Sequence, residues 1–163
     1  MVCAMSDDHL PNLGDICTGL PQRVFHVGRL DSDSEGLLLL TNDGDMAQRI
    51  SHPSQEISKT YQLEVEGTLK ISTKKLLLTG ISLKDGWISL DSIKIKATTP
   101  ATSLIEVQIH SGKNRILRRM FSHVGHPVRR LIRTKIGHLS LGNLAPGEIR
   151  ELQFQDIEKI FAG

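Results

Sequence analysis

Residues 28–44 decide the fold class, and they read Gly28-Arg29-Leu30-Asp31-Ser32-Asp33-Ser34-Glu35-Gly36-Leu37-Leu38-Leu39-Leu40-Thr41-Asn42-Asp43-Gly44. The run 37–41 is apolar at consecutive positions and has turn-forming residues on both sides. This pattern predicts a short strand with both faces buried, as in the centre of a sheet. Asn42 or Asp43 can then cap a short helix that runs toward Ile50 and stops before Pro53.

The rest of the chain alternates short strands and helices without a regular βαβ rhythm, which favours an α+β fold with a mixed, mainly antiparallel sheet and flanking helices. Residues 1–22 are rich in Gly and Pro and are expected to wrap over a single domain that covers 1–163. Further strands are predicted at 24–27, 61–65, 93–97, 105–109, 136–141 and 149–152. Helices are predicted from Ser72 to Leu78 with a stop at Gly80, from a cap at Asn114 to Val124, and from a cap at Asp156 to Phe161.

The composition excludes several classes of protein. No apolar run approaches the roughly 20 residues that cross a bilayer, and the first residues lack the pattern of a signal peptide. The cysteines, Cys3 and Cys17, have no metal-ligand spacing, so we expect two free thiols in a reducing cytoplasm. Six of the histidines (His26, His52, His110, His123, His126 and His138) also form no ligand spacing and are expected to be structural or surface residues.

The formal net charge is only +2, but the charges are unevenly distributed. Between Val107 and Gly147 there is no acidic residue, whereas 31–45 holds five acids and no basic residue. The acid-free basic stretch suits binding to a polyanion such as RNA. A solvated surface, whose positive charges are balanced by acidic residues elsewhere in the fold, explains the uneven charge equally well. The basic residues of the acid-free stretch are Lys113, Arg115, Arg118, Arg119, Arg129, Arg130, Arg133 and Lys135.

The acidic segment permits two metal-based interpretations. Asp31, Asp33 and Glu35 imitate the start of an EF-hand loop, but the twelfth position is Asn42 where a bidentate Glu is needed. Asp31 and Asp33 also suit an aspartyl phosphotransferase, which needs further carboxylates for Mg²⁺. The acid-free stretch is a poor place to find them.

The same segment, from Gly28-Arg29-Leu30-Asp31 to Asn42-Asp43-Gly44, resembles the signature of the pseudouridine synthases of the RsuA family. Two distant motifs extend the resemblance over about residues 20–150: Lys59-Thr60-Tyr61, and the stretch from Ser111-Gly112-Lys113-Asn114-Arg115 to Phe121. The resemblance implies the pseudouridine synthase fold and makes Asp31 the catalytic residue. It also implies that Tyr61 packs on the target base and that Leu117 closes the pocket floor. By position, Lys113 is the cation that faces Asp31, with Arg115 as the alternative.

The implied activity is isomerisation of a uridine in ribosomal RNA, without cofactor or metal. Such chemistry needs an ionised carboxylate near the sugar, acting either as nucleophile or as base, and a neighbouring cation keeps a buried carboxylate charged. A flipped base costs a few kcal/mol, and stacking on Tyr61 would offset much of that. Arg29 is expected to fill the vacated space or bind a phosphate. Contacts to phosphates, which position RNA without reading its sequence, are expected from Arg115, Arg118, Arg119, Arg129, Arg130, Arg133 and Lys135.

Two features of the family are expected to be missing from this chain: the small S4-type RNA-binding domain, and the strand that ends in a Lys-Pro-x-Gly element. We expect a monomer that acts on ribosomal RNA, free or within a pre-ribosomal particle, and that binds no membrane. The competing hypothesis is an RNA-binding module of the same fold without turnover. The sequence specifies neither the target uridine nor the ribosomal subunit.

Overall fold

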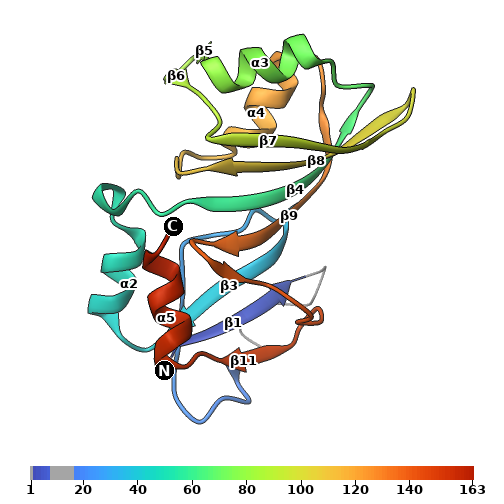
Figure 1. Cartoon of the computed structure of the whole chain (residues 1–163). Coiled ribbons are helices and arrows are strands. Elements are labelled where there is room, and N and C mark those ends of the chain that lie inside the picture. Colours follow the sequence, from blue (N-terminus) through green and yellow to red (C-terminus); the bar gives the residue numbers. More distant parts are fainter. Residues whose placement is uncertain (1, 8–16) are drawn as a thin grey trace. The chain divides into compact units, whose positions relative to one another are not determined.

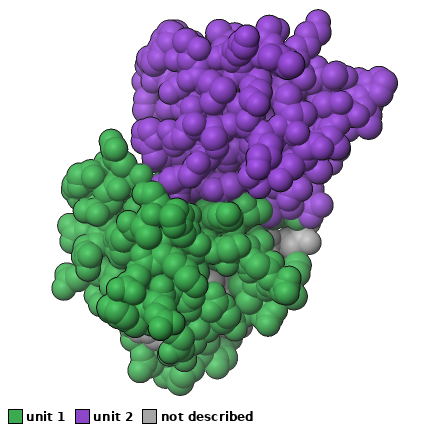
Figure 2. Space-filling view, viewed as in Figure 1, with its two compact units in different colours: residues 1–57, 133–163 green, residues 58–132 purple. Residues whose placement is uncertain are grey.

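The computed structural model describes residues 2–7 and 17–163. The chain divides into two compact units: unit 1 comprises residues 1–57 and 133–163, and unit 2 comprises residues 58–132 (Figures 1 and 2). Strand β9 (Val128–Ile136) begins in unit 2 and ends in unit 1. The predicted fold class is confirmed, because helices accompany strands that pair mainly antiparallel. The prediction of one catalytic domain over 1–163 stays a prediction. Among the described residues, no helix is long and apolar enough to cross a membrane.

Unit 1 is built around β3 (Glu35–Thr41), in the strand order β11 (Ile149–Glu151), β1 (Val2–Asp7), β3, β9. Strand β2 (Phe25–Val27) also pairs with β3, and β10 (Leu139–Ser140) pairs with β9. Both faces of β3 are buried, as its apolar run predicts: Leu37 and Leu39 lie in one apolar cluster, and Leu38 and Leu40 in another. Strand β3 is therefore packed on both faces, which fixes the point where the preceding loop joins it.

The predicted loop at 1–22 is wrong for its first part. Residues 2–7 form β1, which pairs antiparallel with β3 and β11, with Met5 opposite both Leu38 and Ile149. A central strand needs hydrogen-bond partners along both edges, and β1 supplies one of them. The expected absence of the strand that ends in a Lys-Pro-x-Gly element stays a prediction. Residues 8–16 of the predicted loop lie outside the described residues.

The helices of unit 1 are α2 (Gly44–Ser51), the short 3-10 turn η1 (Pro53–Gln55) and α5 (Phe154–Phe161). Asp43 caps α2 as predicted, accepting a hydrogen bond from the Met46 N–H at 3.1 Å. The predicted cap of α5 is wrong by one turn. Gln153 is its N-cap, and Asp156 completes a reciprocal capping box from within the first turn.

Unit 2 has the strand order β9, β4 (Lys59–Glu66), β8 (Thr102–Ile109), β7 (Ser92–Thr98). Helices α3 (Ile71–Thr79) and α4 (Ile116–His123) cover one face of these strands (Figure 1). Leu77 of α3 and Met120 and Phe121 of α4 share one core cluster with Leu63 and Ile105 of the strands. This core positions α4, and with it residues 116–121 of the basic motif, which we define as residues 111–121.

Two details of unit 2 differ from the sequence prediction. A hairpin of β5 (Ile81–Leu83) and β6 (Gly86–Ile88) follows α3 and was not predicted. The predicted caps Ser72 and Asn114 are wrong, since the N-caps are Lys70 and Arg115, and neither makes a side-chain capping bond.

Candidate active site

The Asp31 loop, residues 28–34, connects β2 to β3 in unit 1. It begins at Gly28, whose positive φ of 75° favours a glycine and whose carbonyl is 2.7 Å from Nδ1 of His26. Asp31 opens a tight turn in which its carbonyl accepts from the Ser34 N–H at 2.9 Å. Its side chain is half-buried, whereas Asp33 is exposed. Of the two acids considered from sequence, Asp31 is therefore the one enclosed by protein.

Arg133 of β9 holds both ends of this loop. Its side chain is only 6% exposed. Nε donates to the Leu37 carbonyl at the start of β3 at 2.8 Å, and Nη1 donates to the Arg29 carbonyl at 3.4 Å. Within the described residues, Nη2 is buried without a hydrogen-bond partner. The sequence prediction that Arg133 grips phosphates is wrong, because its guanidinium lies inside the protein and bonds to the main chain.

Gly36, the second residue of β3, has to be a glycine. Its φ is +115°, and a Cβ built there would lie 2.2 Å from the Arg133 carbonyl oxygen. No side chain fits at this distance, so the β3 and β9 backbones approach each other only because residue 36 is glycine. The same close approach brings the Arg133 side chain under the loop that carries Asp31.

In unit 2, Tyr61 lies on β4 opposite Val107 of β8. Its side chain is partly buried and packs against the core cluster that contains Leu63 and Val65. Tyr61 is thus fixed by the core and still reaches the surface, as a stacking residue requires.

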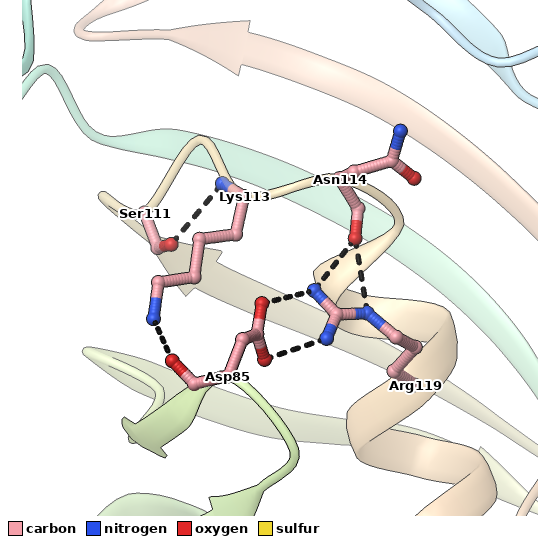
Figure 3. A network of polar contacts seen from close by, with 5 residues as sticks. All are labelled: Asp85, Ser111, Lys113, Asn114 and Arg119. Carbon is pink, nitrogen blue, oxygen red and sulfur yellow. Dashed lines mark hydrogen bonds and ion pairs between the residues drawn. The ribbon is translucent and has the colours of Figure 1, made fainter.

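The basic motif of unit 2 is tied to the β5–β6 hairpin by a polar network (Figure 3). The Asp85 carboxylate receives two hydrogen bonds from the Arg119 guanidinium, at 2.7 and 3.0 Å, and the Asp85 carbonyl accepts from Lys113 Nζ at 3.0 Å. Arg119 also donates to the Asn114 carbonyl from Nε (3.0 Å) and Nη2 (2.8 Å). The side-chain hydrogen bonds from Arg119 lower the pKa of Asp85, and the same pair raises the pKa of Arg119. The loop before α4 is therefore fixed at both Lys113 and Asn114.

Arg115 has the least relaxed backbone of this loop. It lies in the left-handed region, with φ 49° and ψ 31°, directly before α4. Such a conformation costs a non-glycine residue free energy and is found preferentially at functional sites. The side chain of Arg115 is exposed, whereas Leu117 is 3% exposed and belongs to the core cluster.

The other predicted RNA contacts differ in exposure. Arg29, Arg129, Arg130 and Lys135 are exposed, and Arg118 is half-buried. Arg129 lies 3.5 Å from Glu66, a loose ion pair with both side chains half exposed. His26 and His52 make hydrogen bonds to residues two positions away, whereas His110 bonds to Asp91 and His126 to the Glu66 carbonyl. Such bonds are expected of structural residues.

Comparisons with known proteins show the family to which the chain belongs. The family model described as RNA pseudouridylate synthase matches residues 5–123. The chain belongs to the RNA pseudouridylate synthase family. An uncharacterized RNA pseudouridine synthase of Mycobacterium tuberculosis (strain ATCC 25618 / H37Rv) is 42% identical over 165 residues, covering 99% of this chain and 65% of that protein. The ribosomal large subunit pseudouridine synthase B of Bacillus subtilis (strain 168) is 39% identical, covering 91% of this chain and 62% of that protein.

A solved structure described as a crystal structure of pseudouridylate synthase has a TM-score of 0.83 and 27% sequence identity. The match covers 98% of this chain and 73% of the chain in the solved structure. The chain spans 65% of the length of the mycobacterial relative. Its catalytic residues remain predictions. Asp31 belongs to unit 1 and Tyr61, Lys113 and Arg115 to unit 2, so the pairing of Asp31 with a cation also stays a prediction.

Sequence reasoning missed Asp85, and it assigned Arg133 to phosphate contacts and not to the support of the Asp31 loop. Asp85 stands in an Asp-Gly dipeptide between two short apolar runs, which is a hairpin signal that was available. Arg133 gave no such signal, because it stands in a basic stretch that looks like a surface.

Proposed function

We propose that this protein isomerises a specific uridine of ribosomal RNA to pseudouridine, with Asp31 as its catalytic carboxylate. The observation that carries the proposal is the loop of unit 1: the half-buried Asp31 lies in a segment whose two ends are bonded to the buried guanidinium of Arg133. A rigidly held carboxylate is what catalysis needs and what RNA binding alone does not. Ribosomal RNA as substrate is supported by the name of the Bacillus relative.

The reaction is an internal transfer that balances without a cofactor. The N1–C1′ bond of the uridine breaks, the base turns, and C1′ bonds to C5. The proton on C5 leaves, and N1 carries a proton in the product. Asp31 serves either as the nucleophile that holds the base or sugar, or as the base that removes a sugar proton. Tyr61 is proposed to stack on the flipped uracil, and its hydroxyl to help move the C5 proton.

Two cations compete for the role of partner to Asp31. Position in the motif favours Lys113, but its ammonium is bonded to the Asp85 carbonyl. Arg115, which is also exposed and has a left-handed backbone, is the alternative. We therefore propose Lys113 first and Arg115 second. Replacing each by Ala and measuring modification at saturating RNA separates the two, since loss of the partner lowers kcat more than it raises KM.

The exposed Arg29, Arg129 and Arg130 and the half-buried Arg118 and Arg119 are proposed to bind phosphates. Leu117 is proposed to close the pocket floor from the core side. The substrate is ribosomal RNA, free or in a pre-ribosomal particle, and the enzyme acts in the cytoplasm as a monomer. The target uridine and the subunit are to be found by mapping.

The test is modification of ribosomal RNA by the wild type, Asp31→Asn and Asp33→Asn, mapped by carbodiimide adducts that stop reverse transcription. We expect one new stop with the wild type and with Asp33→Asn, and none with Asp31→Asn, with EDTA present. Asp33 is the matched control because it is exposed in the same loop. RNA binding without any stop in reverse transcription would contradict the enzyme hypothesis and favour an RNA-binding module of the same fold.

A further inference from the structure

We propose that the β5–β6 hairpin of unit 2 is an RNA-contacting element, in which Trp87 stacks on a base of the substrate RNA. This inference rests on the proposed function and adds a binding site to it. Four observations on the hairpin support it: an exposed indole, a glycine that seats the indole, a rigid attachment to the basic motif, and a net positive tip.

Trp87 leaves most of its side chain in solvent. It is 64% exposed, although it is one of the largest apolar side chains of the chain. Exposed tryptophans are uncommon on a surface that has no partner, because each one leaves a large apolar area in water. An indole of this kind provides a flat surface on which any base can stack.

The indole is seated on the backbone at the end of α3. A Cβ added to Gly80 would lie 2.3 Å from Nε1 of Trp87, so the ring occupies the space that any other residue would fill. Trp87 pairs with Ser82 across the hairpin, on the strand that follows Gly80. The ring is thus supported from behind, and little side-chain freedom would be lost on binding a base.

The hairpin is also fixed to the loop that carries the proposed cations. Asp85, in the turn between β5 and β6, holds Arg119 by two hydrogen bonds and Lys113 by its carbonyl (Figure 3). Trp87 is two residues further along the chain. The position of the indole is therefore coupled to the position of the basic motif, and Asp85 acts as a positioning residue for both.

The charges at this tip suit a polyanion better than an acidic or apolar partner. Lys84 is exposed in the turn, and Lys113 and Arg119 lie beside Asp85. The carboxylate of Asp85 is compensated by Arg119, which leaves two positive charges in excess. Lysines are depleted at the centre of protein–protein interfaces, whereas cations around an aromatic ring are typical of single-stranded RNA sites.

The experiment uses the only tryptophan of this chain as its own reporter. The probe is an RNA stem-loop that carries the uridine mapped with the wild type, or a fragment of ribosomal RNA if no stop is found. We expect saturable quenching of Trp87 fluorescence, and we expect Trp87→Ala to weaken binding by about 5- to 150-fold, the effect of losing one stacked base. Trp87→Phe should retain most of the affinity.

Ile71→Ala is the matched control, because Ile71 is an apolar side chain of unit 2 that is 68% exposed on α3. It should bind RNA like the wild type. Asp85→Ala should weaken binding and speed the decay of Trp87 fluorescence anisotropy, a sign of a loosened hairpin that a general loss of stability would not produce below the unfolding transition.

The outcomes separate this inference from the proposed function. RNA that binds and is modified while Trp87 fluorescence and Trp87→Ala affinity stay unchanged overturns the hairpin site alone. Quenching without any modification supports the hairpin site and overturns the enzyme. RNA that does not bind the wild type overturns both.

Discussion

Replacing Arg133 by Met should destabilise the protein and release the Asp31 loop. Methionine is apolar and its side chain ends near the position of the arginine Nε, so it fills part of the space of the arginine and cannot donate to the Leu37 and Arg29 carbonyls. The change removes a buried charge and its hydrogen bonds in one step, while Gly36 and the backbone contact between β3 and β9 stay as they are.

The expected decrease in the free energy of unfolding follows from two hydrogen bonds of unequal length. The 2.8 Å bond to Leu37 is a normal bond from a charged donor, which contributes about 1.5–3 kcal/mol, and the 3.4 Å bond to Arg29 adds little. The free energy of unfolding should therefore fall by about 1.5–3 kcal/mol. For a chain of this size, each kcal/mol lowers Tm by roughly 2–4 °C, so we expect a Tm lower by about 3–12 °C.

The assay is urea and thermal unfolding of Arg133→Met beside Arg129→Met. Arg129 is on the same strand, but it is half exposed and makes only a loose pair with Glu66, so its replacement should cost less than about 1 kcal/mol. A variant as stable as the wild type, or more stable, would refute the reasoning. It would mean that desolvation of the guanidinium outweighs its bonds. A folded Arg133→Met protein should also modify RNA at least tenfold more slowly.

Three further predictions concern other parts of the molecule. Gly137→Ala should lower the free energy of unfolding by about 2–4 kcal/mol in urea, because its Cβ would meet the Ile160 carbonyl at 2.1 Å, whereas Gly142→Ala, with a similar φ and nothing within 4 Å, should cost only about 1–2 kcal/mol. Asp156→Asn should cost about 0.3–1 kcal/mol at pH 7, because the amide oxygen can still accept from the Gln153 N–H but the negative charge at the helix N-terminus is lost. The hydrogen bond from the Gln153 N–H, with help from Arg150, lowers the pKa of Asp156, so its contribution is present above the ordinary carboxyl pKa and is lost as the pH falls through the lowered one. Urea titrations of both proteins from pH 7 to pH 3 should therefore converge at the acid end, and a constant difference would contradict this. RNA affinity should fall steeply with salt, with a log–log slope of about −0.7 for each phosphate contact to a single strand, and Arg130→Ala should make that slope shallower by about one contact.

The sequence predicted best where a pattern is local. Leu37–Leu40 alternate between two buried clusters, and an uninterrupted apolar run of strand length between turn-forming residues suits the centre of a sheet. Asp43 caps α2 because a short acidic side chain directly before a helix can accept a hydrogen bond from an unpaired N–H of the first turn. Ser72 and Asn114 looked equivalent to Asp43 but are not caps, since packing of Leu77 and of Ile116 against the core decides where those helices begin.

What sequence reasoning missed depends on contacts between distant residues. The burial of Arg133 arises from bonds to residues about 100 positions earlier, and nothing in the basic run around it distinguishes it from Arg129 or Arg130. Strand β1 pairs with β3 and β11, and its own six residues carry no clear periodicity. Strands β5 and β6 have only three residues each, too short for a periodic pattern, and Asp85 gains its role only once the hairpin meets α4.

The interrupted path of the chain through unit 1 has a consequence for biosynthesis. Unit 2 is a continuous segment, residues 58–132, whereas unit 1 joins residues 1–57 to 133–163 across it. On a translating ribosome, unit 2 can complete its core before the second half of unit 1 has been made. The nascent chain then carries Asp31 on a loop that lacks its guanidinium support until β9 emerges. The carboxylate is synthesised early, and its fixed geometry is acquired late.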